Sequence, residues 1–293
     1  MGVEDGETAF PDRVMKTSIN LLLWTTRVTE DDLRHVETVR DAGYTGVEVP
    51  IHQPDAAHHA MIGARIREMG LEMTASTALP GADADFLSAD PAVRRAAGDY
   101  LRGVVDATAA LGSKILMGPL YQALGVFTGL PPSADEFARA ADGLREVADH
   151  AAGAGVSLMI EPLNRFECHL LNTLADGEKL VEAIGRPNVA LAYDAFHANI
   201  EETDPLGAID RFHPVIGHVH LSENHRGAPG SGHLPLAETV RRFLDHGYDG
   251  WFVVEAFGTA LPDLAAATRC WRATFDSERE VVQAGARLFG SFD

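Results

Sequence analysis

The sequence predicts a single α/β domain, a (β/α)8 TIM barrel. Short apolar runs alternate with longer helical stretches along almost the whole chain, which is typical of a parallel sheet. Eight such strand–helix units follow one another between residues 15 and 293 without a linker-like break. The length of 293 residues also suits one barrel, which needs roughly 250 residues. Residues 1–14 are expected to form a polar N-terminal extension.

The expected strands are short runs rich in Val, Ile, Leu and other apolar residues, bounded by glycine or polar residues. In chain order they are Lys16–Leu23, Gly46–Ile51, Leu71–Thr77, Ser113–Gly118, Val156–Glu161, Val189–Asp194, Val215–Leu221 and Gly250–Glu255.

The expected helices begin with capping residues and often end in glycine. Thr29 precedes an acidic first turn, and Asp90 with Pro91 opens the longest helix, which runs to Leu111. The helix that Thr29 opens is expected at Thr29–Ala42. The remaining helices are expected at Asp55–Met69, Ser133–Ala154, Thr173–Ile184, Asp204–Phe212, Leu236–His246 and in the helical region Pro262–Leu288.

An open, doubly wound sheet is the alternative architecture for such alternation. It is disfavoured because no glycine-rich dinucleotide fingerprint follows the first strand. Eight units point to closure of the sheet into a barrel.

Charge and cysteine usage exclude several classes of partner. The chain carries 24 Lys+Arg against 43 Asp+Glu, a formal net charge of −19, so it lacks the basic footprint that nucleic acid binding requires. No apolar run reaches the ~18 residues of a membrane span. The N-terminus has no secretory pattern, and two cysteines cannot form a disulfide framework, so we expect a cytoplasmic protein.

Metal-capable side chains occur at the ends of four consecutive strands. In a barrel, the catalytic groups come from the C-terminal ends of the strands. Those of strands five to eight carry Glu161, Asp194, His220 and Glu255. Three carboxylates and one imidazole suit a divalent cation that prefers oxygen, with Mn²⁺ first and Co²⁺ or Mg²⁺ as alternatives. His218 lies on the same strand face as His220 and is its rival as ligand.

The loops after these strands add polar groups that can face the same pocket. Glu167 follows strand five, His197 comes three residues after Asp194, and Arg226 lies in the glycine-rich loop after strand seven. The simpler alternatives are a salt bridge between Glu167 and Arg165 and a solvent-exposed charge at Arg226. Trp24, after the first strand, either stacks on a substrate or packs against the barrel.

Three of these loop stretches carry a family resemblance. EPLNRFE, DAFHANIEE and HVHLSENHRGAPGSG are similar to stretches of the ketose 3-epimerases of the xylose-isomerase-like barrel superfamily, as is the C-terminal CWRATFDSEREVVQAGARLF. The resemblance implies metal ligands at Glu161, Asp194, His220 and Glu255, and substrate contacts at Glu167, His197 and Arg226. It also implies a homodimer or homotetramer.

The implied reaction is epimerisation at C3 of a free ketose through a metal-stabilised cis-enediolate. Glu161 and Glu255 are the expected acid/base pair, because a proton must leave one face of C3 and return to the other. A free sugar is expected because the loops after strands seven and eight offer glycines and Arg226 but no lysine for a phosphate.

Other functions on the same barrel remain alternatives. They are a sugar isomerase, a keto-glycoside epimerase acting at C4, and a keto-inositol dehydratase. A metal-dependent endonuclease conflicts with the charge of −19. A non-catalytic barrel is disfavoured because clustered carboxylates repel one another without a cation.

Overall fold

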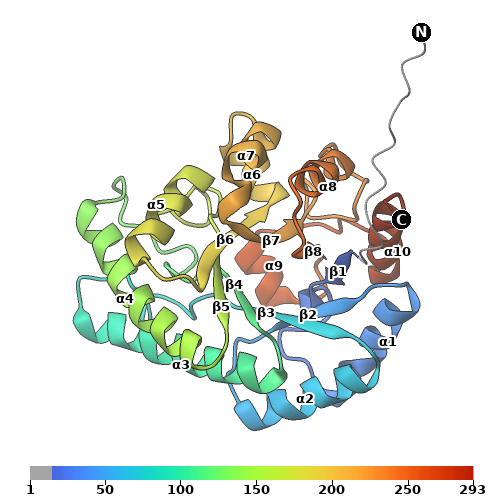
Figure 1. Ribbon diagram of the computed structural model, residues 1–293, viewed down its shortest axis with the longest axis horizontal. Helices are drawn as coiled ribbons and strands as arrows, with labels where there is room; N and C mark the ends of the chain where they lie inside the picture. Colours follow the sequence, from blue (N-terminus) through green and yellow to red (C-terminus); the bar gives the residue numbers. More distant parts are fainter. Residues whose placement is uncertain (1–14, 293) are drawn as a thin grey trace.

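The fold is a parallel eight-stranded barrel surrounded by helices, as the sequence predicts (Figure 1). The computed structural model describes residues 15–292, so the predicted extension at residues 1–14 lies outside the described residues. The strands are β1 (Lys16–Ile19), β2 (Gly46–Pro50), β3 (Glu72–Ser76), β4 (Ile115–Gly118), β5 (Ser157–Ile160), β6 (Val189–Asp194), β7 (Ile216–Leu221) and β8 (Trp251–Val254).

The helices follow the strands and cover the outside of the barrel (Figure 1). They are α1 (Leu33–Asp41), α2 (Ala56–Glu68), α3 (Pro91–Leu111), α4 (Ala134–Gly153), α5 (Leu174–Ile184), α6 (Ala195–Glu201), α7 (Pro205–Phe212), α8 (Leu236–Asp245), α9 (Pro262–Thr268) and α10 (Glu278–Phe289). Short 3-10 turns lie at Leu21–Leu23, Glu30–Asp32 and His213–Val215.

Parallel pairing runs from β1 through β8 and back to β2, in the order β1-β8-β7-β6-β5-β4-β3-β2. The remaining seam, between β1 and β2, is bridged just beyond β1 by a parallel bridge between Asn20 and Glu48. Near the opposite end of the strands, the Thr45 amide donates to the Thr17 carbonyl across the same seam at 3.0 Å. All strands therefore present their carboxyl ends on one face of the barrel.

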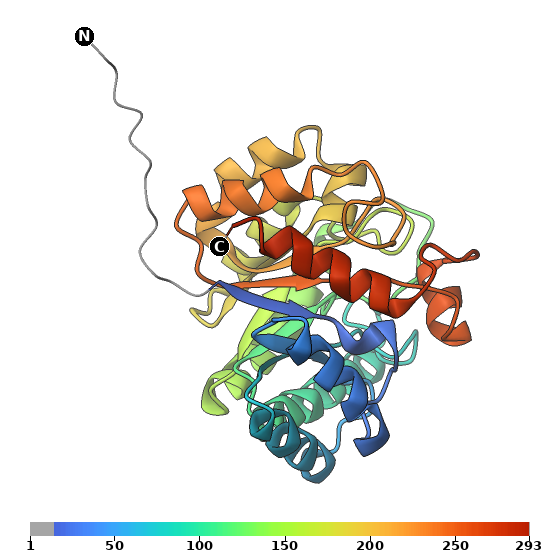
Figure 2. The ribbon, with the colours of Figure 1, turned by 90° about the vertical axis from the view of Figure 1, so that its right-hand side faces the viewer.

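The first and last parts of the chain pack together. In Figure 2, α10 (red) lies beside the blue N-terminal strands and helix. Here the Tyr44 hydroxyl donates to the Val282 carbonyl at 2.9 Å, and the Tyr44 ring meets Phe289 edge to face. The C-terminal helix thus completes the helical layer next to the seam between β1 and β2.

Three element predictions needed correction. The first strand ends at Ile19 instead of Leu23, because the Asn20 side chain accepts from the Leu22 amide and starts a 3-10 turn. The stretch after Asp194 is α6 rather than a loop. The region Pro262–Leu288 is two helices, since α9 ends at Arg269, whose φ of +60° is left-handed.

Among the described residues, no helix is both long and apolar enough to cross a membrane. Cys168 and Cys270 are both free thiols.

Candidate active site

Four side chains with metal-ligating groups meet at the carboxyl ends of β5 to β8. Asp194 is the last residue of β6, His220 lies one residue before the end of β7, and Glu161 and Glu255 directly follow β5 and β8. All four are buried, and none is more than 6% exposed. The barrel therefore brings together residues that are up to 94 positions apart in the sequence.

The three carboxylates surround one nitrogen of His220. Its Nδ1 lies 3.4 Å from a Glu255 oxygen, 3.8 Å from Asp194 and 4.0 Å from Glu161. Within the described residues this buried Nδ1 has no hydrogen-bond partner. An unpartnered imidazole nitrogen facing three carboxylate oxygens is a donor set that fits a divalent cation.

The pKa values of Glu161 and Glu255 are shifted in opposite directions. Burial raises the pKa of Glu161 well above its usual value, and the nearby Glu255 and Asp194 raise it further. Burial also acts on Glu255, but the charges of His220 and Arg226 outweigh it and lower its pKa. Two carboxyls of one cavity whose pKa values are shifted in opposite directions form the arrangement that acid/base chemistry uses.

The pKa of His220 is also shifted by its surroundings. Burial alone would lower its pKa, but the carboxylates of Glu48 and Glu255 outweigh burial and raise the pKa well above the usual value. A proton on His220 and a proton on Glu161 therefore compete with a cation for this site.

Asp194 also fixes the start of α6. Its Oδ1 accepts from the amides of Phe196 and His197 at 2.6 and 3.3 Å, which caps the helix. This cap places the His197 ring next to the site, with its Nε2 at 3.1 Å from Arg226 Nη2. Burial lowers the pKa of His197 to about 3, so the ring is neutral.

Arg226 brings a positive charge into the site. Its Nη1 donates to Glu255 at 2.8 Å and to Ser222 at 3.1 Å, and its guanidinium lies over the Phe196 ring at 3.9 Å. Only 4% of Arg226 is exposed, so the alternative of a solvent-exposed surface charge is wrong.

Glu167 is positioned by its own loop. The Asn164 amide donates to Glu167 at 2.8 Å, whereas Arg165 pairs with Glu201 at 2.8 Å. The alternative of a Glu167–Arg165 salt bridge is therefore wrong. Burial raises the pKa of Glu167.

A cavity opens onto this group of side chains. Five of the predicted site residues line it: Glu161, Glu167, His197, Arg226 and Glu255. Asp194 and His220 lie below its surface, where both are 3% exposed or less. Aliphatic side chains, among them Leu124 and Leu264, form part of the wall.

Trp24 is the predicted site residue that the structure does not bring to this cavity. Its ring stacks on His35 with the centroids 4.9 Å apart, and it lines a different hollow between α1 and α10. The strand ends at Ile19, so the intervening 3-10 turn carries Trp24 outward instead of along the barrel wall. This corrects the sugar-stacking prediction in favour of the packing alternative.

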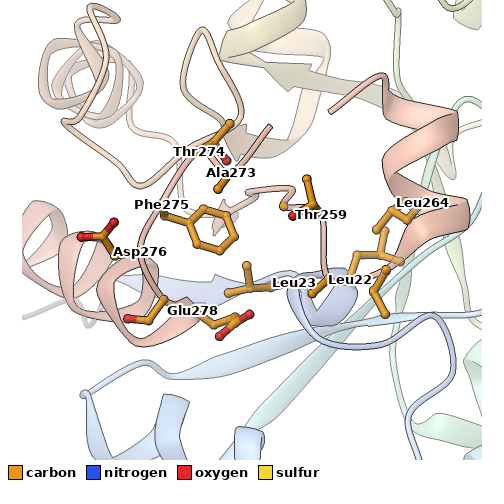
Figure 3. A pocket seen from close by; sticks show the side chains of 13 residues that line it. Leu22, Leu23, Thr259, Leu264, Ala273, Thr274, Phe275, Asp276 and Glu278 are labelled. Atoms are coloured by element: carbon orange, nitrogen blue, oxygen red, sulfur yellow. The ribbon is translucent and has the colours of Figure 1, made fainter. Parts of the chain in front are cut away.

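A second cavity, shown in Figure 3, shares part of its lining with the first. Leu22 and Leu264 line both cavities, while Thr259 and Phe275 belong to the second alone. None of the metal-capable residues at the strand ends lines this second cavity.

The sequence analysis missed the role of Glu48, which lies in the middle of β2 and is fully buried. Its two oxygens accept from Nε2 of His218 and Nε2 of His220, each at 2.8 Å. Both imidazoles are thus paired with Glu48, and His220 differs from its rival in that its Nδ1 lies within 4.0 Å of Glu161, Asp194 and Glu255. A lone acidic residue inside the apolar run GVEVPI is the signal that could have revealed this role.

Comparison with known proteins gives consistent results. Residues 36–276 match the family model described as "Xylose isomerase-like TIM barrel". The chain is 32% identical to a ketose 3-epimerase of Arthrobacter globiformis, covering 94% of this chain and 95% of the relative. It is 34% identical to an L-ribulose 3-epimerase of Mesorhizobium japonicum, covering 88% and 87%.

Solved structures show the same relationship. The crystal structure of a D-allulose 3-epimerase from Methylomonas sp. in complex with D-allulose superimposes with a TM-score of 0.88. It is 27% identical in sequence, and the match covers 97% of this chain and 98% of that one.

Metal affinity is expected to rise with pH. The pKa values of Glu161 and His220 are raised, so a cation that binds these groups competes with protons for them. Each displaced proton contributes about a tenfold gain in Mn²⁺ affinity per pH unit. Titration calorimetry from roughly pH 6 to 8 measures this slope. Glu161→Gln should reduce the slope by one proton, and an affinity independent of pH would contradict the expectation.

Proposed function

The chain belongs to the ketose 3-epimerases of the xylose isomerase-like TIM-barrel family, and from that premise we propose that it epimerises a free ketose at C3 with the help of one divalent cation. The observation that carries this proposal is the unpartnered Nδ1 of His220, facing three buried carboxylates next to the cavity.

The proposed cation ligands are Glu161, Asp194, His220 and Glu255. A predominantly oxygen donor set supports Mn²⁺ as the native ion, with Co²⁺ and Mg²⁺ as alternatives. When bound, such an ion supplies Lewis-acid stabilisation of the negative charge that develops on the substrate oxygens.

Glu161 and Glu255 are the proposed acid/base pair. They follow β5 and β8, so they reach the cavity from different parts of the barrel wall. A carbon-bound proton next to a carbonyl is only weakly acidic, so its removal needs a positioned base. One carboxylate removes the C3 proton, and the other returns a proton to the opposite face. In the reverse reaction the two residues exchange roles.

Arg226, His197 and Glu167 are proposed to hold the O1–O2 end of the ketose. All three line the cavity beside the acid/base pair. A rigidly held guanidinium, a neutral imidazole and a carboxyl can donate to and accept from the hydroxyls of a sugar. The aliphatic wall formed by Leu124 and Leu264 would then face the remaining carbon atoms of the ketose.

The reaction in D₂O tests the proposed function. A panel of free ketoses, incubated with Mn²⁺, should yield C3 epimers that carry deuterium at C3, because the returned proton comes from solvent-exchanged carboxyls. Nuclear magnetic resonance locates the label. Label at C1 or C2 would instead identify an isomerase, label at C4 a keto-glycoside epimerase, and loss of water a dehydratase.

Glu161→Gln should abolish turnover while the protein stays folded, because the amide cannot accept the C3 proton. We expect kcat to fall by about 10²- to 10⁴-fold, which is the range that general acid/base groups contribute. Glu72→Gln is the matched control, an exposed glutamate at the opposite end of β3. Near-wild-type kcat for Glu161→Gln, measured at saturating Mn²⁺, would refute the assignment.

We further propose that the protein forms a homodimer or homotetramer. The loops after β4 and β5 are joined by the Gly125 amide, which donates to the Glu167 carbonyl at 2.9 Å. These two loops expose Leu130 and Phe166, at 71% and 63% of their surface. Exposed apolar groups on adjacent loops are typical of an interface.

Light scattering should therefore give a mass of two or four chains. Phe166→Asp should shift the distribution of oligomeric states toward the monomer. Met61 is an exposed apolar residue on α2, and Met61→Asp should leave this distribution unchanged. A monomeric wild-type protein would contradict this part of the proposal.

A further inference from the structure

The Asn20 side chain connects two carboxylates at the base of the cavity. Asn20 is 1% exposed and directly follows β1. Its Nδ2 donates to Glu48 at 3.0 Å and to Glu255 at 3.1 Å. Glu48 lies on β2 and Glu255 directly follows β8, and these are the strands on either side of β1.

The orientation of this amide is fixed by its other end. The Asn20 Oδ1 accepts from the backbone amide of Leu22 at 2.9 Å. A flipped side chain would place Oδ1 against two carboxylate oxygens and Nδ2 against an N–H group, so every contact would become repulsive. Asn20 therefore acts as a double donor toward Glu48 and Glu255.

Glu48 in turn orients the imidazole of His220. The Oε1 that accepts from Asn20 also accepts from His220 Nε2 at 2.8 Å. A carboxylate has no proton to donate, so Nε2 carries the hydrogen and the lone pair of a neutral ring lies on Nδ1. That is the nitrogen that faces Glu161, Asp194 and Glu255.

The second oxygen of Glu48 is held separately. Oε2 accepts from Thr74 at 2.9 Å and from His218 at 2.8 Å. Four donors thus converge on one fully buried carboxylate, which compensates the cost of burying its charge. Of these donors, Asn20 is the one that also donates a hydrogen bond to Glu255 in the described residues.

We propose that Asn20 is a positioning residue that sets the mutual geometry of His220, through Glu48, and of Glu255, by direct contact. This inference rests on the proposed function, because it assigns His220 and Glu255 to the cation site and Glu255 to proton transfer. Residues that orient metal ligands typically contribute 10- to 100-fold to metal affinity or activity.

Asn20→Asp is the most informative variant. It preserves the shape of the side chain and the acceptor for the Leu22 amide, but it replaces the double donor with an oxygen beside two carboxylates. We expect Mn²⁺ affinity to fall by about 10- to 100-fold, and kcat at saturating Mn²⁺ to fall by about tenfold or more. The KM for the ketose should change less than kcat, since both ends of the Asn20 amide are already hydrogen-bonded within the protein.

Ser18→Ala and Thr74→Val are the controls. Ser18 is a fully buried residue of β1 whose hydroxyl has no partner within the described residues, so Mn²⁺ affinity and kcat should be unchanged. Thr74→Val removes one donor from Glu48 but leaves Glu255 untouched, so its effect on kcat should be smaller than that of Asn20→Asp. If Asn20→Asp fails to fold, Asn20→Ser retains one donor and should give an intermediate loss.

Calorimetric Mn²⁺ titration of each full-length variant, together with kcat and KM, decides the outcome. Mn²⁺ affinity and kcat of Asn20→Asp within twofold of the wild type would overturn the positioning role. Equal losses of kcat in Asn20→Asp and Thr74→Val would also overturn the direct link to Glu255. Wild-type protein that neither binds Mn²⁺ nor epimerises ketoses would instead refute the proposed function itself.

Discussion

Three carboxylates and an imidazole share one buried volume at the mouth of the barrel, and the rest of the site depends on how their charges are compensated. Buried like charges repel strongly unless a proton, a cation or a hydrogen-bond donor lies between them. In the described residues, the guanidinium of Arg226 contacts Asp194 and Glu255, and the raised pKa values of Glu161 and His220 favour their protonated forms. A divalent cation would replace the protons and use the same oxygens as ligands.

The barrel makes this concentration of charge possible. Parallel strands end on one face, so side chains at or just beyond the ends of β5 to β8 are brought to the same level. The seam between β1 and β2 contributes to the same site, because Asn20 and Glu48 bridge the two strands and their side chains reach Glu255 and His220. The same two residues thus take part in barrel closure and in the arrangement of the site.

Much of this could be predicted from the sequence, for a physical reason. The barrel follows from the alternation of apolar runs with capped helices, and Glu161, Asp194, His220 and Glu255 each stand at a position that this alternation identifies as a strand end. Arg226, His197 and Glu167 follow those strands so closely that the loops have little freedom to place them elsewhere. These predictions needed only local pattern and the rule that strand ends share a face.

The predictions that failed depended on contacts between distant residues or on local caps. The role of Glu48 requires knowing that β2 faces β7 across the barrel interior, and no spacing in the sequence encodes that contact. Trp24 was misplaced because the Asn20 side chain ends the first strand early. The sequence analysis predicts Asp194 as a strand end and a metal ligand but not as the N-cap of α6, although one of its oxygens caps the helix and the other faces His220.

The central claim is that one cation binds between Glu161, Asp194, His220 and Glu255. Two other groups of the described residues could compete for it: Glu48 with His218 and His220, and Glu161 with Asp194 and His197. Anomalous diffraction from crystals soaked in Mn²⁺ distinguishes these directly. We expect a single peak within bonding distance of Nδ1 of His220 and of all three carboxylates. A peak in either of the other groups, or none in the barrel at saturating Mn²⁺, would contradict the claim.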